Sequence, residues 1–200
     1  MTGANIFFNN FSTMIFRFYG GVGIPYGRST TLPYIKQYFV GGAYSIRGWR
    51  PRVLGPGSYL DPKVNSDGLN NLFIDQAGDI KLEFNAEYRF TIARLFANAI
   101  SLNGALFTDA GNIWLARRDE QLPNAEFDLK RLGQDIAVSS GLGFRVDFGG
   151  FLVVRLDYAI QMKKPYINEH YGWTIQNMKL GDPEWRRNNT NFNIAIGYPF

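Results

Sequence analysis

The chain has 200 residues, of which 46% are hydrophobic, 16% aromatic and 19% charged, and its formal net charge is +4. This length suits about one domain, and the sequence has no apolar run of the roughly 18 residues that a membrane-spanning helix requires. The lack of cysteine excludes disulfides and thiolate metal sites, and the scattered basic residues disfavour nucleic-acid binding, which needs a clustered basic face. Many aromatic residues and 22 glycines, without a long apolar block, are typical of a transmembrane β-barrel.

The first segment, MTGANIFFNN, has no basic stretch followed by an apolar one and so does not match an export signal. We therefore expect either an internal or C-terminal piece of a longer chain or a chain whose export signal is missing from this sequence. In residues 11–23, FSTMIFRFYGGVG, the alternation is imperfect, but Met14, Phe16, Phe18 and Val22 share one face. This spacing of apolar residues predicts a β-strand.

A long polar stretch, residues 25–78, follows this strand and includes GGAYSIRGWRPRVLGPG at 41–57. Glycine and proline mark bends in such a stretch. Its centre, Ile46-Arg47-Gly48-Trp49, combines a charge with two large apolar side chains. This composition indicates a buried segment rather than a loop surrounded by water.

Residues 80–90, IKLEFNAEYRF, alternate strictly between apolar and polar side chains, which is the period of a β-strand. The polar face carries Lys81, Glu83, Asn85, Glu87 and Arg89. Placing that face against a dry core would be costly. One face of the strand must therefore meet water while the other meets an apolar medium.

Four later segments show the same period: 100–114, 135–148, 151–160 and 191–200. Asp109 falls on the polar face of the first. The next two predict a hairpin whose polar face carries a ladder of charges across the strands: Arg145, Asp147, Arg155 and Asp157. In the last segment the apolar residues share one face: Phe192, Ile194, Ile196, Tyr198 and Phe200.

These patterns predict an all-β fold, an antiparallel transmembrane β-barrel of which the chain supplies about six strands. Strands of roughly nine to thirteen residues can cross a bilayer when tilted, whereas strands of soluble proteins usually have about five or six. Short links at 91–98 and 149–150 alternate with long polar stretches at 25–78, 115–133 and 161–190, as periplasmic turns and extracellular loops do. A closed barrel takes about eight strands, and lipid cannot satisfy an open sheet edge. The sheet therefore needs further strands, either upstream or from other copies of the chain, and we expect them upstream.

Four strings together resemble the BamA/TamA family of outer-membrane assembly factors, also called bacterial surface antigens. FVGGAYSIRGWRPRVLGPGS (39–58) is similar to the family's long extracellular loop, whose Val/Ile-Arg-Gly-aromatic motif matches Ile46-Arg47-Gly48-Trp49. ALFTDAGNIW (105–114) and SSGLGFRVDFGGFLVVRLDYA (139–159) are similar to later strands of its barrel. The terminal Phe200, with Ile196 and Tyr198, looks like the recognition signal of outer-membrane barrels.

The resemblance implies a barrel of about sixteen strands, preceded by periplasmic POTRA domains, in the outer membrane of a Gram-negative cell. Residues 1–200 would be the C-terminal part of that barrel, with the POTRA domains and first strands absent. In the family the loop folds back into the lumen, where Arg47 would pair with acids of the inner wall. The strand alternation independently places Glu87 and Asp109 on that wall. We expect Gly48 to supply an unusual backbone conformation and Trp49 to pack against the wall.

The function implied is assistance in the insertion, assembly or translocation of proteins at the outer membrane, through strand pairing at a lateral seam formed by residues 191–200. Expected partners are the outer-membrane bilayer, client outer-membrane proteins and periplasmic or lipoprotein assembly partners, and no nucleic acid. We expect no catalytic residue, metal or cofactor, since the one histidine, His170, falls in a polar loop. The alternatives are a two-partner-type secretion pore, a diffusion porin, and a barrel anchor fused to an upstream hydrolase.

Overall fold

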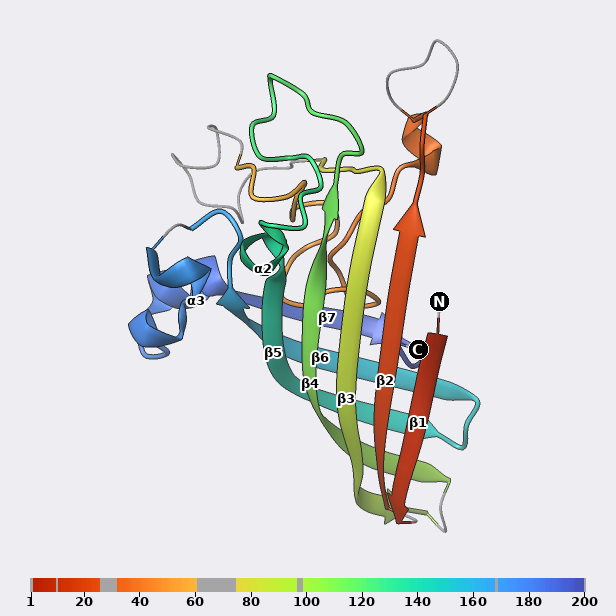
Figure 1. The fold of residues 1–200 in the computed structure, drawn as a ribbon. Coiled ribbons are helices and arrows are strands. Elements are labelled where there is room, and N and C mark those ends of the chain that lie inside the picture. Colours follow the sequence, from red (N-terminus) through yellow and green to blue (C-terminus); the bar gives the residue numbers. More distant parts are fainter. Residues whose placement is uncertain are drawn as a thin grey trace.

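The computed structural model describes residues 2–9, 11–25, 32–60, 75–96, 99–167 and 169–199. These residues form one antiparallel sheet in which each strand pairs with the next along the chain (Figure 1). Its seven strands are β1 (Thr2–Asn9), β2 (Ser12–Val22), β3 (Ile80–Leu95), β4 (Ile100–Trp114), β5 (Ala137–Phe148), β6 (Leu152–Lys163) and β7 (Thr190–Ile196). The all-β antiparallel fold class is therefore confirmed.

The strand count and several strand boundaries differ from the prediction. β1 was not predicted because its apolar residues are consecutive rather than alternating, and its register against β2 shifts between Phe7 and Asn9. Residues 91–98 were expected to be a short link, but β3 continues to Leu95. A register shift between Thr91 and Ala93 interrupts the alternation there. A β-bulge of this kind moves the following side chains to the other face and so hides a strand from a period-two pattern.

Helical elements are short and lie in the connections. They are the 3-10 turns η1 (Tyr34–Lys36), η2 (Glu169–Gly172) and η3 (Ile175–Asn177) and the helices α2 (Leu132–Asp135) and α3 (Pro183–Asn189). Within the described ranges, no helix is long and apolar enough to cross a membrane. At the opposite end of the sheet, Gly149 and Gly150 make the tight β5–β6 turn with φ of 60° and 78°, a conformation that favours glycine.

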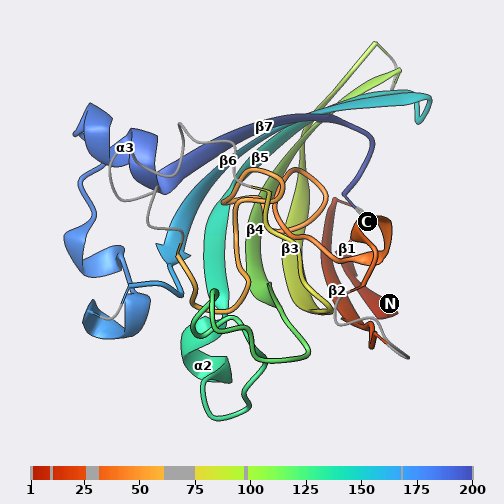
Figure 2. The ribbon, with the colours of Figure 1, turned by 90° about the horizontal axis from the view of Figure 1, so that it is seen from above.

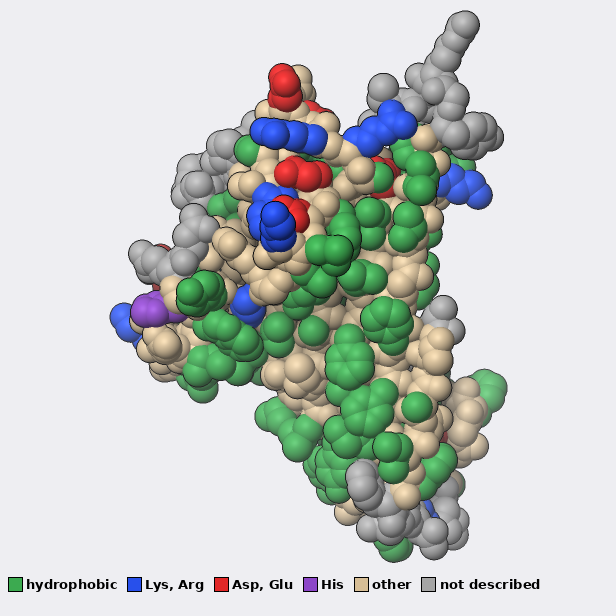
Figure 3. Space-filling view, in the orientation of Figure 1, with side chains coloured by type: hydrophobic (Ala, Val, Ile, Leu, Met, Phe, Trp, Pro, Cys, Tyr) green, Lys and Arg blue, Asp and Glu red, His purple; other side chains and the backbone are tan. Residues whose placement is uncertain are grey.

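The two faces of the sheet differ in polarity. Large apolar side chains are exposed on the outer face: Phe18, Val22, Phe84, Leu106, Leu142, Phe144, Phe192 and Ile194. Figure 3 shows patches of apolar side chains over the part of this face that is turned to the viewer. The inner face carries charged and amide side chains that are buried: Glu83, Asn85, Glu87, Asp109, Arg145, Arg155 and Asp157. A sheet of this kind suits lipid on one side and a filled polar lumen on the other.

The described part of the connection between β2 and β3, residues 32–60, covers the inner face, and Figure 2 shows it within the curve of the sheet. Its apolar side chains make a buried cluster with β4 and β5: Val40, Ile46, Trp49, Leu54, Ile113 and Ala137. The loop is therefore part of the core of the described structure, and it positions the motif described next.

Candidate functional site

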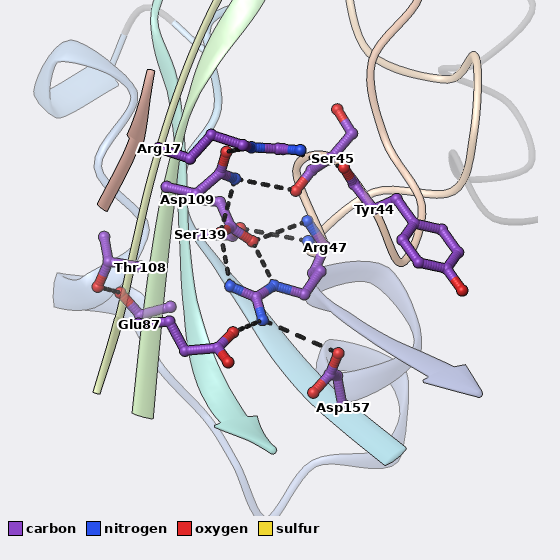
Figure 4. A network of polar contacts seen from close by, with 12 residues as sticks. Arg17, Tyr44, Ser45, Arg47, Glu87, Thr108, Asp109, Ser139 and Asp157 are labelled. Atoms are coloured by element: carbon purple, nitrogen blue, oxygen red, sulfur yellow. Dashed lines mark hydrogen bonds and ion pairs between the residues drawn. The ribbon is translucent and has the colours of Figure 1, made fainter. Parts of the chain in front are cut away.

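Arg47 is fully buried and lies against two acids from neighbouring strands, Asp109 and Glu87, with Asp157 of β6 further away at 3.9 Å (Figure 4). Its Nε and Nη2 donate to the two carboxylate oxygens of Asp109 on β4, both at 2.8 Å, and its backbone N–H donates to Asp109 Oδ2 at 3.0 Å. Its Nη1 donates to Glu87 Oε2 on β3 at 2.5 Å. The paired bonds to Asp109 use the planar fork of the guanidinium, which matches a carboxylate.

Surrounding groups complete the hydrogen bonding of both acids. Asn85 Nδ2 donates to Asp109 Oδ1 at 3.0 Å, and Arg145 Nη2 donates to Glu87 Oε1 at 2.7 Å. The Arg47 guanidinium also lies 3.5 Å from the centre of the Phe107 ring. Burial alone would lower the pKa of Arg47, but Asp109 and then Glu87 raise it above its ordinary value. Arg47 is therefore charged, and its charge is matched within the site.

Gly48 passes too close to β5 to carry a side chain. Its N–H donates to Ser139 Oγ at 3.2 Å, and its carbonyl accepts from Gln161 Nε2 at 2.8 Å. A Cβ added to Gly48 would lie 2.5 Å from Ser139 Cβ. The expectation of a special backbone conformation was wrong, since Gly48 lies outside the left-handed region. Glycine is needed here for close approach between loop and wall.

Ile46 and Trp49, on either side of this pair, are both buried in the apolar cluster with Ile113 and Ala137. Residues just ahead of the motif are held by polar contacts instead. Ser45 Oγ donates to Glu83 Oε2 at 2.5 Å. The motif thus has apolar side chains packed into the core and one charged side chain directed into the polar wall.

The carbonyl of Arg47 is bound by the terminal strand. Asn191 Nδ2 and Asn193 Nδ2, both on β7, each donate to Arg47 O at 2.9 Å. A third link joins the hydroxyl of Tyr44 to the carbonyl of Ile196, at the end of β7. The alternation of residues 191–200 places both asparagines on the polar face, but it does not indicate which group they bind.

The predicted C-terminal group is divided by a turn. β7 ends at Ile196, whose side chain is 67% exposed on the outer face. Gly197 follows with φ of 84°, and Tyr198 then lies with Arg89 over its ring at 4.6 Å and its hydroxyl 3.3 Å from Asp147 Oδ2. The expectation that Tyr198 shares the face of Ile196 was therefore wrong, because the chain turns inward at Gly197. Phe200 lies outside the described residues.

The predicted charge ladder on β5 and β6 has a different arrangement from a simple alternation of signs. Arg145 and Arg155 are directly opposite each other. Asp157 lies near both, with Oδ2 at 3.1 Å from Arg155 Nε and Oδ1 at 3.6 Å from Arg145 Nη2. Asp147 instead accepts from the N–H of Gly150 in the turn, at 2.7 Å. The two facing arginines therefore depend on Asp157 and Glu87 for compensation.

Comparison with known proteins agrees with this geometry. The chain matches the Omp85 superfamily domain over residues 3–200. It is also 31% identical over 97 residues to the outer membrane protein assembly factor BamA of Neisseria meningitidis serogroup B, a match that covers 48% of this chain and 11% of that protein. The family resemblance drawn from the motifs is thereby confirmed. The chain belongs to the Omp85 superfamily of outer-membrane β-barrel proteins, the group that includes protein-assembly factors.

Proposed function

We propose that residues 1–200 are the C-terminal part of the barrel of an assembly factor that helps other proteins insert into the outer membrane. The observation that carries this proposal is the network around Arg47. Its side chain is bound by β3 and β4, and its carbonyl is bound by Asn191 and Asn193 of β7. One loop residue therefore joins the fixed wall of the barrel to the strand at which a client would pair.

The chemistry proposed for β7 is backbone hydrogen bonding. Among the described strands, β7 has β6 as its one neighbour, so its other edge presents N–H and C=O groups to an incoming strand. Exposed edges template further strands in this way. Such pairing needs no cofactor and no covalent step. In the complete barrel, this edge would be shared between the first strand and a client.

The test is depletion of the full-length protein in its Gram-negative host. We expect the levels of several unrelated outer-membrane barrels to fall while those of inner-membrane proteins stay constant. Unchanged barrel levels, in a strain shown to carry no second homologue, would contradict the proposal. Loss of one exported protein with normal barrel levels would favour a secretion pore, and loss of a surface hydrolase activity alone would favour an enzyme anchor.

A second experiment addresses the seam. A photo-reactive residue at Ile194, which is exposed on β7, should cross-link to a client barrel whose assembly has been stalled. The matched control places the photo-reactive residue at Leu106 on β4, which is also exposed on the outer face. It should give no client adduct. Equal cross-linking from both positions would argue against strand pairing at β7.

A further inference from the structure

A hollow of about 630 Å³ lies at the end of the sheet where β7 begins. Arginines from two parts of the chain line it: Arg50 from the inward loop, and Arg186 and Arg187 from α3. Tyr158 and Phe192 also line it. None of the described lining residues is acidic. The hollow therefore combines positive charge with an aromatic surface.

The aromatic surface is continuous with the outer face of the sheet. Tyr158 on β6 and Phe192 on β7 are directly opposite each other, and their side chains are 37% and 57% exposed. Leu142 of β5 is the next partner of Tyr158 and is exposed on the same face. Because this face meets lipid in an outer-membrane barrel, the hollow opens beside acyl chains.

The arginines are brought there by contacts of the loop and of α3. Arg50 is three residues beyond Arg47, whose carbonyl is bound by Asn191 and Asn193 at the start of β7. Arg186 lies in the last turn of α3, directly before β7, and its Nη1 donates to Leu180 O at 2.6 Å. A guanidinium has five N–H donors, so this bond leaves others for a ligand. Asp182 caps the opposite end of α3 by accepting from Glu184 N.

We propose that this hollow binds the phosphate headgroup of an anionic outer-leaflet lipid, a phosphorylated glycolipid of the lipid A type, at the edge of the terminal strand. Arginine suits phosphate because its planar fork makes paired, charge-assisted hydrogen bonds. The two aromatic lining residues favour an amphiphile over a soluble anion, since acyl chains can follow Tyr158 and Phe192 onto the outer face. The proposal rests on the outer-membrane location and not on the assembly function.

The strand lengths give this site a particular position. Among the described strands, β7 is the shortest, with 7 residues against 16 in β3, and it begins opposite Ile160, three residues before β6 ends at Lys163. A headgroup bound there would be held closer to the membrane centre than one beside β3. The site would therefore fix lipid beside the shortest of the described strands.

The experiment uses the full-length protein in nanodiscs of phosphatidylcholine, with or without lipid A, and measures lipid A retained by native mass spectrometry after extraction. Replacing Arg50, Arg186 and Arg187 together by glutamine should lower retention by about tenfold or more. The matched control is Arg117→Gln with Arg118→Gln and Lys130→Gln, three exposed basic residues of the β4–β5 connection. This control should stay within about twofold of the parent protein, as expected for charges outside a site.

Three results of the retention experiment would overturn the proposal. These are unchanged retention in the first variant, an equal loss in both variants, and a loss reproduced by millimolar inorganic phosphate, which would indicate a free-anion site. A photo-reactive residue at Phe192 that labels protein instead of lipid A in cells would also overturn it and would indicate a peptide occupant. Folding is checked by heat-modifiable gel migration, and Arg187→Gln alone, at an exposed position, carries the test should the triple variant not fold.

Discussion

The two sides of Arg47 are bound with different strength, and the difference indicates which part of the barrel can move. Its guanidinium makes charge-assisted bonds to Asp109 and Glu87 on the long strands β3 and β4. Its carbonyl accepts two bonds from neutral amides, Asn191 and Asn193, on the shorter edge strand β7. Charge-assisted hydrogen bonds are roughly twice as strong as neutral ones. We therefore expect the loop to stay with β3 and β4 when β7 opens.

The largest loss of stability should come from removing the Arg47 side chain and its ion pairs with β3 and β4. Arg47→Ala leaves Asp109 and Glu87 buried with less compensation, and removing one partner of a buried ion pair typically costs about 3–5 kcal/mol. Urea unfolding of the barrel, followed by heat-modifiable migration, measures this. Arg117→Ala, at an exposed position, is the control and should change the unfolding free energy by less than about 0.5 kcal/mol.

A second prediction tests whether Arg47, Glu87 and Asp109 act as one network. Glu87→Gln together with Asp109→Asn should also destabilise the barrel, and adding Arg47→Ala to that pair should cost clearly less than the sum of the separate changes. Groups in one hydrogen-bond network couple in this way, whereas independent groups add. Full additivity would show that the three side chains act separately.

A smaller loss is expected from Gly48→Ala, which tests the close approach between loop and wall. The new Cβ would lie 2.5 Å from Ser139 Cβ, and overpacking of this kind costs about 1–3 kcal/mol. Ser139→Gly removes the atom that clashes and should restore part of the loss in the double variant. A Gly48→Ala protein as stable as the parent would mean that the loop can move away from β5.

How far these contacts could be predicted depends on what an alternating pattern contains. It assigns a face to each residue, and this was enough to place Glu87 and Asp109 on the wall that faces Arg47. It does not assign a height along the barrel, so the contact between Gly48 and Ser139 could not be predicted. Tyr198 was assigned to the wrong face because the turn at Gly197 interrupts the period. Bulges and turns of this kind move the following side chains to the other face of the sheet, and the amino-acid composition does not indicate where this happens.

The asparagines of β7 show a different limit. Their positions on the polar face were evident from the alternation, but an amide on a water-facing surface has no distinctive signal, and a hydrogen bond to a backbone carbonyl involves no matching side chain. A charge on the inner face predicts a partner of opposite sign, because burying it alone is costly. The ion pairs of the Arg47 side chain could therefore be predicted from the sequence, and the hydrogen bonds to its carbonyl could not.

The hydrogen bonds between β7 and the Arg47 carbonyl can be removed without changing the ion pairs of the side chain. Replacing Asn191 and Asn193 by alanine removes two neutral hydrogen bonds, each worth about 1 kcal/mol. Backbone amide hydrogen exchange should become faster in β7 and in the loop around Arg47, while the amides of β3 keep their protection from exchange. Asn177→Ala, at an exposed position in η3, serves as the control. Equal loss of protection in β3 and β7 would contradict the distinction between the two sides.

The smallest expected effect is a change of stability with pH, caused by Lys164 near the start of β7. Burial lowers the pKa of Lys164 to about 8, and its Nζ donates to Asn188 O at 3.1 Å, just ahead of β7. Since this pKa lies below the ordinary lysine value, folding favours the neutral amine, and stability should increase as pH rises from 8 towards the unfolded value. Between pH 7 and 9 the increase should be about 1 kcal/mol. Urea unfolding at both pH values should show this in the parent and not in Lys164→Met. An equal pH response in the two proteins would assign the effect to another group.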